Sequence, residues 1–267
     1  MFSFTPGTVP LLVSFPHAGT EIPERLAARM TPEALQRADV DWHLPRLYAF
    51  AQAMGASTIA ASFARHVVDL NRPPEDTSLY PGQDVTGLLP LDTFRKQPLY
   101  LPGRAPDATE AQQRRATYWQ PYHDRLRAEL ERLRALHGSV VLWDAHSIAS
   151  VMPRFFDGKL PDLNLGTADG RACAPGIQAA VEAEMGAQKG EGRQFTHISN
   201  GRFKGGHITR HYGKPEGGIH ALQLEICQST YMDETAPFAY RPDLAEQVQP
   251  LLERMLNAAL QTRPQRA

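Results

Sequence analysis

The chain has 267 residues, of which 42% are hydrophobic and 21% are charged, and its formal net charge is −1. This length and composition are typical of one globular domain with a large core, and the lack of a basic excess argues against nucleic acid as a partner. The two cysteines, Cys173 and Cys227, form no CxxC pair, which excludes a cysteine-rich zinc site.

The amino-terminal stretch predicts neither a signal peptide nor a membrane span. Residues 1–19 have no basic start, and their apolar run is too short for either purpose. We therefore expect a cytoplasmic protein with no membrane partner.

The first half of the chain contains several predicted strands and a long irregular stretch. An apolar run over residues 9–15 predicts a buried strand, and residues 31–55 have helical content. Further strands are expected at residues 57–62 and 65–70. Residues 73–107 are rich in proline, glycine and aspartate without a clear period, which is typical of a functional or mobile loop.

The second half alternates helices and strands more clearly. Residues 109–138 form the strongest helical pattern, and residues 139–146 predict a strand that is apolar on both faces. A short helix is expected at 174–186, a late strand at 217–229 and a closing amphipathic helix at 241–261. This alternation predicts an α/β fold with a largely parallel sheet.

Groups that could bind a metal follow the predicted strands. His17 follows the first strand, His146 ends the middle one and Glu225 lies in the last, while Asp41 and Glu21 come soon after the first. Ligands of open α/β sheets bind outside the carboxyl ends of the strands, and a catalytic zinc usually has three protein ligands. Each histidine could equally be an ordinary hydrogen-bonding residue, and Glu225 could pair with a structural arginine.

Two basic stretches are candidates for substrate binding. Residues 65–72 end in Asn71 and Arg72, and arginine binds carboxylates with a forked geometry. A later glycine-rich stretch carries Arg202 and Arg210, which could meet an acidic substrate or lie in a solvated basic loop.

Seven stretches, in order along nearly the whole chain, together resemble the N-formylglutamate amidohydrolase family. They are "SFPHAGTEIP" (14–23), "DVDWHLPRLY" (39–48), "RHVVDLNRP" (65–73), "LWDAHSI" (142–148), "LNLGTADG" (163–170), "GRFKGGHITRHYG" (201–213) and "HALQLEI" (220–226). The resemblance implies one domain over residues 1–267, with a mixed, largely parallel sheet flanked by helices as in zinc carboxypeptidases and aspartoacylases. It also implies zinc-dependent hydrolysis of N-formyl-L-glutamate to formate and L-glutamate, a step of histidine degradation.

The resemblance also implies roles for the metal-site residues. His17 and His146 correspond to the metal histidines, and Glu225 to the general base. The carboxypeptidase-like pattern is His-x-x-Glu, whereas this chain has His-x-x-x-Glu between His17 and Glu21. We therefore favour Asp41 as the third ligand.

The remaining implied roles concern the substrate. Arg65 would help to stabilise negative charge on the formyl oxygen. Asn71 and Arg72 would hold one substrate carboxylate, and Arg202 with Arg210 the other.

Several alternatives stay open at this stage. The same site chemistry would serve a deacylase of another N-acyl amino acid or of a short peptide. Without a metal, the chain could be a dicarboxylate-binding protein. Histidine and carboxylate ligands also suit other divalent transition metals, and the oligomeric state is open.

Overall fold

A seven-stranded mixed sheet forms the centre of the fold. The computed structural model describes residues 1–79, 82–188 and 193–264. The strands lie in the order β1 (Phe2–Thr5), β3 (Ser57–Ala61), β2 (Leu11–Phe15), β4 (Val140–Ile148), β7 (Ile219–Cys227), β5 (Leu163–Gly166) and β6 (His197–Ser199). Only β1 with β3 and β5 with β7 pair antiparallel. The predicted single α/β domain with a mixed, largely parallel sheet flanked by helices is confirmed.

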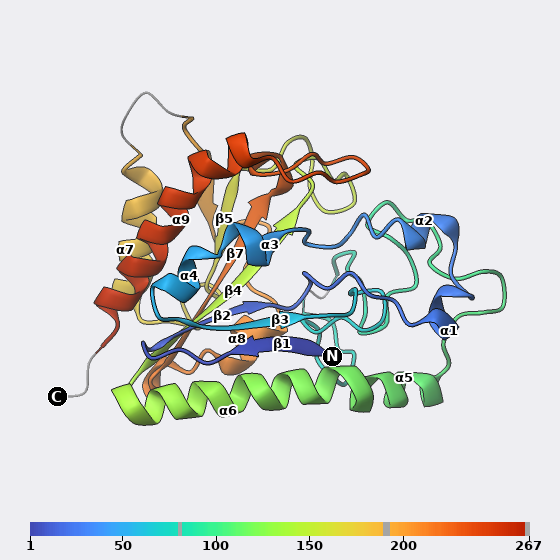
Figure 1. Ribbon diagram of the computed structural model, residues 1–267, viewed down its shortest axis with the longest axis horizontal. Coiled ribbons are helices and arrows are strands. Elements are labelled where there is room, and N and C mark those ends of the chain that lie inside the picture. Colours follow the sequence, from blue (N-terminus) through green and yellow to red (C-terminus); the bar gives the residue numbers. More distant parts are fainter. Residues whose placement is uncertain (80–81, 189–192, 265–267) are drawn as a thin grey trace.

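Helices cover both faces of this sheet (Figure 1). On one face lie α3 (Leu44–Leu47), α4 (Phe50–Ala53), α7 (Pro175–Gly186) and α9 (Pro242–Thr262). On the other lie α6 (Gln120–His137) and α8 (His207–Tyr212). Two short helices, α1 (Glu24–Ala27) and α2 (Pro32–Leu35), lie beyond the carboxyl ends of the strands. None of the described helices is both long and apolar enough to cross a membrane.

The predicted helix over residues 109–138 is confirmed, with one irregular turn. It consists of α5 (Ala108–Arg114), a π-helical turn at Arg115–Trp119, and α6. Pro121 follows this turn and has no N–H to donate, so the wider hydrogen-bonding register falls where the regular one would lose a bond.

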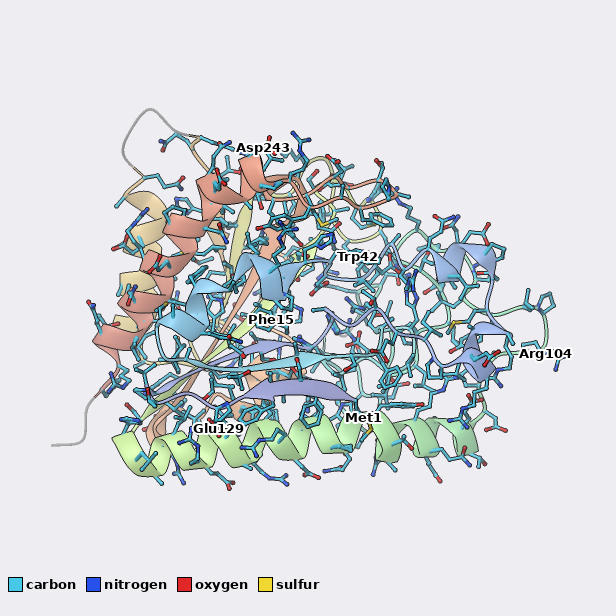
Figure 2. The ribbon with its side chains drawn as sticks, in the orientation of Figure 1. Met1, Phe15, Trp42, Arg104, Glu129 and Asp243 are labelled. Atoms are coloured by element: carbon cyan, nitrogen blue, oxygen red, sulfur yellow. The ribbon has the colours of Figure 1, made fainter. Side chains whose placement is uncertain are left out.

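The core is divided by the sheet into two layers. Strands β2 and β4 are buried along their whole length, because helices cover both faces. Trp143 and Val141 pack toward α7 and α9, whereas Leu142 packs toward α6. Figure 2 shows Phe15 in the interior, while Arg104 and Asp243 lie at the periphery.

The α6 face of the sheet changes from apolar to polar along β4 and β7. Val140, Leu142 and Ala221 belong to the core on that face. Because side chains alternate with a period of two, the next residues on the same face are Asp144, His146, Gln223 and Glu225. Asp144 lies in register with Gln223, and His146 with Glu225. The same strands therefore supply the core at one end and polar groups at the other.

Some local predictions were wrong. Residues 65–70 form an irregular, buried segment and no strand, because the Val67 amide closes a turn onto the Ala64 carbonyl and the Asp69 amide donates to the Leu88 carbonyl. The helical content predicted for residues 31–55 is confirmed, as three short helices, α2, α3 and α4. Three short strands (β1, β5 and β6) and the helix α8 were not predicted.

Candidate metal centre and active site

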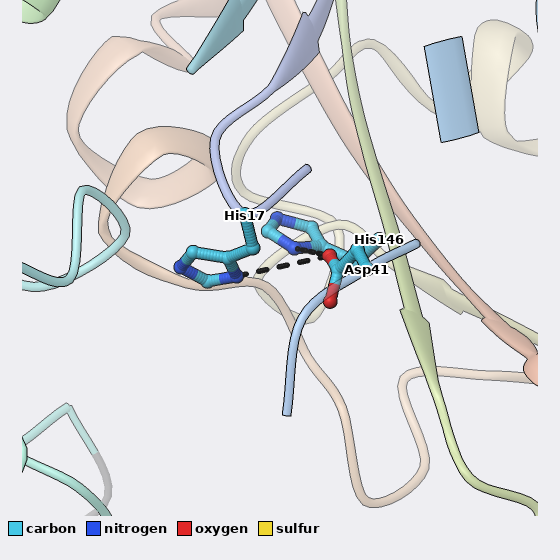
Figure 3. Close-up of side chains that lie close together, drawn as sticks. All are labelled: His17, Asp41 and His146. Atoms are coloured by element: carbon cyan, nitrogen blue, oxygen red, sulfur yellow. Dashed lines mark hydrogen bonds and ion pairs between the residues drawn. The ribbon is translucent and has the colours of Figure 1, made fainter. Parts of the chain in front are cut away.

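Three side chains from separate segments meet at the carboxyl end of the sheet. His17 follows β2, Asp41 lies in the turns before α3, and His146 is near the end of β4. Their candidate ligand atoms all lie within 4.8 Å of one another. Asp41 Oδ2 is 3.1 Å from His146 Nδ1 and 3.8 Å from His17 Nδ1. Figure 3 shows both imidazoles directed at this carboxylate.

The backbone explains why Asp41, and not Glu21, joins the histidines. The Asp41 amide donates to the carbonyl oxygen of His17 at 3.0 Å, which ties the two segments together. The Asp41 side chain is almost completely buried. Glu21 is exposed, and its backbone pairs with the segment around Phe63.

Each histidine has a buried carboxylate on its far side. His17 Nε2 lies 2.7 Å from Asp69 Oδ1, and His146 Nε2 lies 2.9 Å from Asp144 Oδ2. Carboxylates only accept hydrogen bonds, so both Nε2 atoms carry protons, and both Nδ1 atoms face Asp41. The Asn71 amide nitrogen, which lies 3.0 Å from His146 Nε2, then donates to Asp144 Oδ2 and not to the imidazole. An outer carboxylate of this kind is the usual partner of a metal-binding histidine.

The Nδ1 atom of His17 carries the strongest sign that a cation fits here. Within the described part of the chain it is buried and has no hydrogen-bond partner. A buried nitrogen without a partner costs free energy, which a divalent ion bound between His17, Asp41 and His146 would remove. Two imidazole nitrogens and one carboxylate oxygen form a donor set typical of catalytic zinc.

The two histidines have opposite proton affinities in the metal-free protein. Burial and the nearby Arg65 guanidinium lower the pKa of His17, although Asp69 opposes them. Burial also lowers the pKa of His146, but the Asp144 and Asp41 carboxylates outweigh it and raise that pKa well above its ordinary value.

The cluster of His17, Asp41 and His146 borders a cleft with about 570 Å³ of empty space, including its mouth. Its charged lining consists of His17, His146, Glu225, Arg65, Arg72 and Arg202. The apolar part of the lining includes Phe94, Phe155 and Phe203. An arginine-rich cleft with one free carboxylate suits a small anionic substrate.

Glu225 stands on β7 directly opposite His146. Burial, with Asp41 contributing, raises the pKa of its carboxyl to about 8, although His146 acts in the opposite direction. Among the described residues, no hydrogen bond or ion pair to this carboxylate is found. A carboxyl with a pKa near neutrality can both take and give a proton.

Arg65 lies in the cleft wall and contacts the His17 side of the site. Its guanidinium donates to Asp69 Oδ2 at 2.6 Å and lies 4.6 Å from the centre of the Phe94 ring. Burial raises the pKa of Asp69, but Arg65 and then His17 more than offset this, so the pKa lies well below its ordinary value. Asp69 is therefore a permanent anion.

Asn71 and Arg72 both line the cleft. The Asn71 side-chain oxygen accepts from the Ile208 amide at 2.8 Å, and its nitrogen lies 3.3 Å from Asp144 Oδ2, so both ends of the amide have protein partners. Arg72 donates from Nε to the Thr86 carbonyl at 2.7 Å.

The indole of Trp119 donates to the carbonyl oxygen of Arg72 at 3.0 Å. The same indole stacks on the imidazole of His123, with ring centroids 3.7 Å apart. These contacts fix the backbone of Arg72.

The structure brings Arg202 to the cleft, but not Arg210. Arg202 donates to the carbonyl oxygen of Phe155 at 2.8 Å, and its guanidinium lies 5.5 Å from the ring centres of Phe155 and Phe203. Arg210 donates to the Gly205 carbonyl and lines a separate surface hollow.

Sequence reasoning missed the outer carboxylates and Gln223. Asp144 lies two residues before His146, so the strand period would have placed it on the same face. Nothing in the spacing of Asp69 indicated its contact with His17. The loop over residues 73–107 contributes Val85 and Phe94 to the cleft lining.

Comparisons with known proteins identify the family of this chain. A family model for N-formylglutamate amidohydrolase matches residues 9–232. The N-formylglutamate deformylase of Pseudomonas aeruginosa is 51% identical over 260 residues, which cover 97% of this chain and 96% of that protein. That of Pseudomonas putida is 48% identical over the same shares. The crystal structure of an N-formylglutamate amidohydrolase from Ralstonia eutropha JMP134 has a TM-score of 0.83 at 26% identity, covering 98% of each chain.

The fold and the site, with these matches, define an amidohydrolase, an enzyme that hydrolyses a carbon–nitrogen amide bond. The chain belongs to the N-formylglutamate amidohydrolase family, and the resemblance found in the sequence is confirmed. The likeness to zinc carboxypeptidases and aspartoacylases stays a prediction.

Proposed function

We propose that the protein hydrolyses N-formyl-L-glutamate to formate and L-glutamate, as a step of histidine degradation. The names of the two Pseudomonas relatives support the substrate, at 51% and 48% identity over nearly the whole chain. The arginine-lined cleft beside the histidine cluster supports an N-acyl amino acid with two carboxylates. The free, buried cysteines Cys173 and Cys227 fit the expected cytoplasmic location.

In this proposal His17, Asp41 and His146 hold a divalent ion, with zinc as the first candidate. The observation that carries the proposal is the buried, unpartnered Nδ1 of His17, which faces the same carboxylate as His146 Nδ1. When bound, such an ion supplies Lewis acidity, which activates water near neutral pH and polarises a carbonyl group.

Glu225 acts as the general base and then as the general acid. Its carboxylate takes a proton from the attacking water and delivers it to the departing amino group of glutamate. Its elevated pKa and its place opposite His146 support this role. Arg65, held by Asp69, stabilises negative charge that develops on the formyl oxygen.

The substrate carboxylates are assigned to two arginines of the cleft. Arg72 holds one carboxylate and Arg202 the other, since both residues line the same cleft. Asn71 lines it as well, but its side-chain amide is bonded to the Ile208 amide and to Asp144, so we assign it to holding Asp144. Arg210 lies outside the cleft, so we assign it no substrate carboxylate.

Formate release from N-formyl-L-glutamate tests the reaction. We expect turnover by the purified protein, loss of turnover after chelation, and recovery when zinc is added back. Failure to release formate from a metal-loaded, folded protein would contradict the proposed substrate. A parallel assay with N-acetyl- and N-succinyl-glutamate tests the acyl group.

The arginine assignment has its own test. N-formyl-L-glutamine lacks the side-chain carboxylate of N-formyl-L-glutamate. The arginine that binds this carboxylate is either Arg72 or Arg202. Its replacement by glutamine is expected to lower kcat/KM strongly for N-formylglutamate and only slightly for N-formylglutamine. Arg210→Gln is the matched control, because Arg210 does not line the cleft. Equal losses on both substrates in both cleft variants would refute the assignment.

A further inference from the structure

A buried chain of hydrogen bonds runs from helix α6 to the cluster of His17, Asp41 and His146. The Tyr122 hydroxyl of α6 lies 3.0 Å from Ser14 Oγ on β2. Ser14 Oγ donates to Asp144 Oδ1 on β4 at 3.0 Å, and Asp144 Oδ2 accepts from His146 Nε2 at 2.9 Å. All four side chains are at most 3% exposed.

The chemistry of these groups gives the chain one direction. Asp144 can only accept, so the single proton of the Ser14 hydroxyl goes to Oδ1. The Tyr122 hydroxyl must then donate to Ser14, because the Ser14 proton is already used. Each donor therefore points toward Asp144, and no member can reverse without leaving a buried group unsatisfied.

The chain fixes the rotation of the Asp144 carboxylate. A carboxylate turns freely about its last bond, and only one orientation presents an oxygen to His146 Nε2. Ser14 lies in register with Asp144 on the neighbouring strand and holds Oδ1, which leaves Oδ2 facing the imidazole. The Asn71 amide also donates to Oδ2, but at the longer distance of 3.3 Å. The orientation of the imidazole in turn sets where Nδ1 points.

We propose that Tyr122 and Ser14 are positioning residues, which hold His146 through Asp144 with its Nδ1 lone pair directed at the metal site. The inference rests on the metal-binding part of the proposed function, and it is independent of the substrate. The His17 side of the site has no counterpart, since Arg65 holds Asp69 there.

Zinc affinity tests the proposal with two variants and two matched controls. Ser14→Ala and Tyr122→Phe each remove one hydroxyl of the chain. Ser57→Ala removes another buried serine that donates to a buried carboxylate, and Tyr212→Phe another buried, hydrogen-bonded tyrosine. Among the described residues, neither is hydrogen bonded to Asp144 or His146. Zinc dissociation constants of the full-length chain are measured by chelator competition, with thermal midpoints of the metal-free protein.

We expect Ser14→Ala to weaken zinc binding about 10-fold, the lower end of the effect of removing outer partners of a ligand. A smaller loss is expected for Tyr122→Phe, because it acts one bond further away. The controls are expected to lose thermal stability without losing zinc affinity. The proposal is overturned if a control variant and a chain variant that lose the same thermal stability also lose the same zinc affinity.

Proton NMR of the imidazole N–H groups in the zinc-loaded protein gives a second, site-selective measurement. Each metal-binding histidine contributes one Nε2–H proton resonance at low field. Ser14→Ala is expected to shift the His146 resonance and leave that of His17 unchanged, which a general loosening of the fold would not do. Equal shifts of both resonances, or none, would refute the positioning role. If Ser14→Ala does not fold, Tyr122→Phe gives the same test.

Discussion

The two histidines of the site rest on carboxylates that are held in different ways. On one side, His17 donates to Asp69, and the other oxygen of Asp69 accepts from the charged Arg65. The negative charge of this carboxylate is thereby balanced by a group that cannot lose its proton. Burial and Arg65 lower the pKa of His17 accordingly.

On the other side, His146 donates to Asp144, and the other oxygen of Asp144 accepts from the neutral hydroxyl of Ser14. The Asn71 amide, which donates to Asp144 Oδ2, is neutral as well. Burial lowers the pKa of His146, but the Asp144 and Asp41 carboxylates outweigh it and raise this pKa. Similar pairs of imidazole and carboxylate therefore have opposite electrostatics. The third residue is charged on one side and neutral on the other, and Asp41 lies closer to His146 than to His17.

The largest effect on turnover is expected from Glu225→Gln. This variant is a reference for both histidine–carboxylate pairs, because Glu225 belongs to neither. Glu225 is hydrogen bonded to neither outer carboxylate among the described residues, so the variant is expected to keep its zinc affinity. Its turnover is expected to fall by about 10²- to 10⁴-fold, the usual contribution of general acid–base catalysis. The exposed Glu21→Gln is the control, and full activity in Glu225→Gln would remove Glu225 from this role.

The next prediction compares how much Asp69 and Asp144 each contribute to the free energy of unfolding. Asp69→Asn leaves the Arg65 guanidinium buried without its anion, so we expect a loss of about 3–5 kcal/mol of unfolding free energy. Asp144→Asn is expected to lose only about 1–3 kcal/mol, because His146 can release its proton when its partner is gone. Chemical denaturation of the metal-free variants measures both values. Equal losses would show that Arg65 makes no difference between the two sides.

The smallest effect is a divergent pH dependence of stability in the metal-free protein. The pKa of His17 is lowered below 6.5, so the unfolded chain binds more protons and this site loses stability as pH falls below about 6.5. The pKa of His146 is raised, so its contribution is fully present below 6.5 and is lost as pH rises through the folded value.

Two neutral variants separate these contributions. Relative to wild type, His17→Gln is expected to gain stability on acidification, and His146→Gln to gain it as pH rises. Urea midpoints between pH 5 and 8.5 measure both trends. Parallel trends in the two variants would contradict the comparison.

The parts of the site that could be predicted are those set by strand periodicity. His146 and Glu225 lie at the carboxyl half of long, buried strands, where α/β sheets bind ligands. The preference for Asp41 over Glu21 rests on the family resemblance. The spacing along the sequence does not show which of the two carboxylates lies close to the histidines in the fold. Asp69 was expected in a strand, yet its role depends on an irregular segment that no period describes.

The parts of the fold that escaped prediction are short. The strands β1, β5 and β6 have three or four residues each, too few for an alternating pattern to stand out. The six-residue helix α8 lies within a glycine-rich, basic stretch that looked like a loop. Because Arg210 belongs to that helix, its side chain follows the helical period and misses the cleft that Arg202 reaches.

The indole of Trp119 gives the enzyme a built-in optical probe. It is bonded to the backbone of Arg72, whose side chain lines the cleft, and it stacks on His123. The chain has only three tryptophans, so a change at Trp119 forms a large part of the total emission. Occupation of the cleft by a dicarboxylate is expected to alter tryptophan fluorescence, so that ligand titrations need neither a label nor turnover.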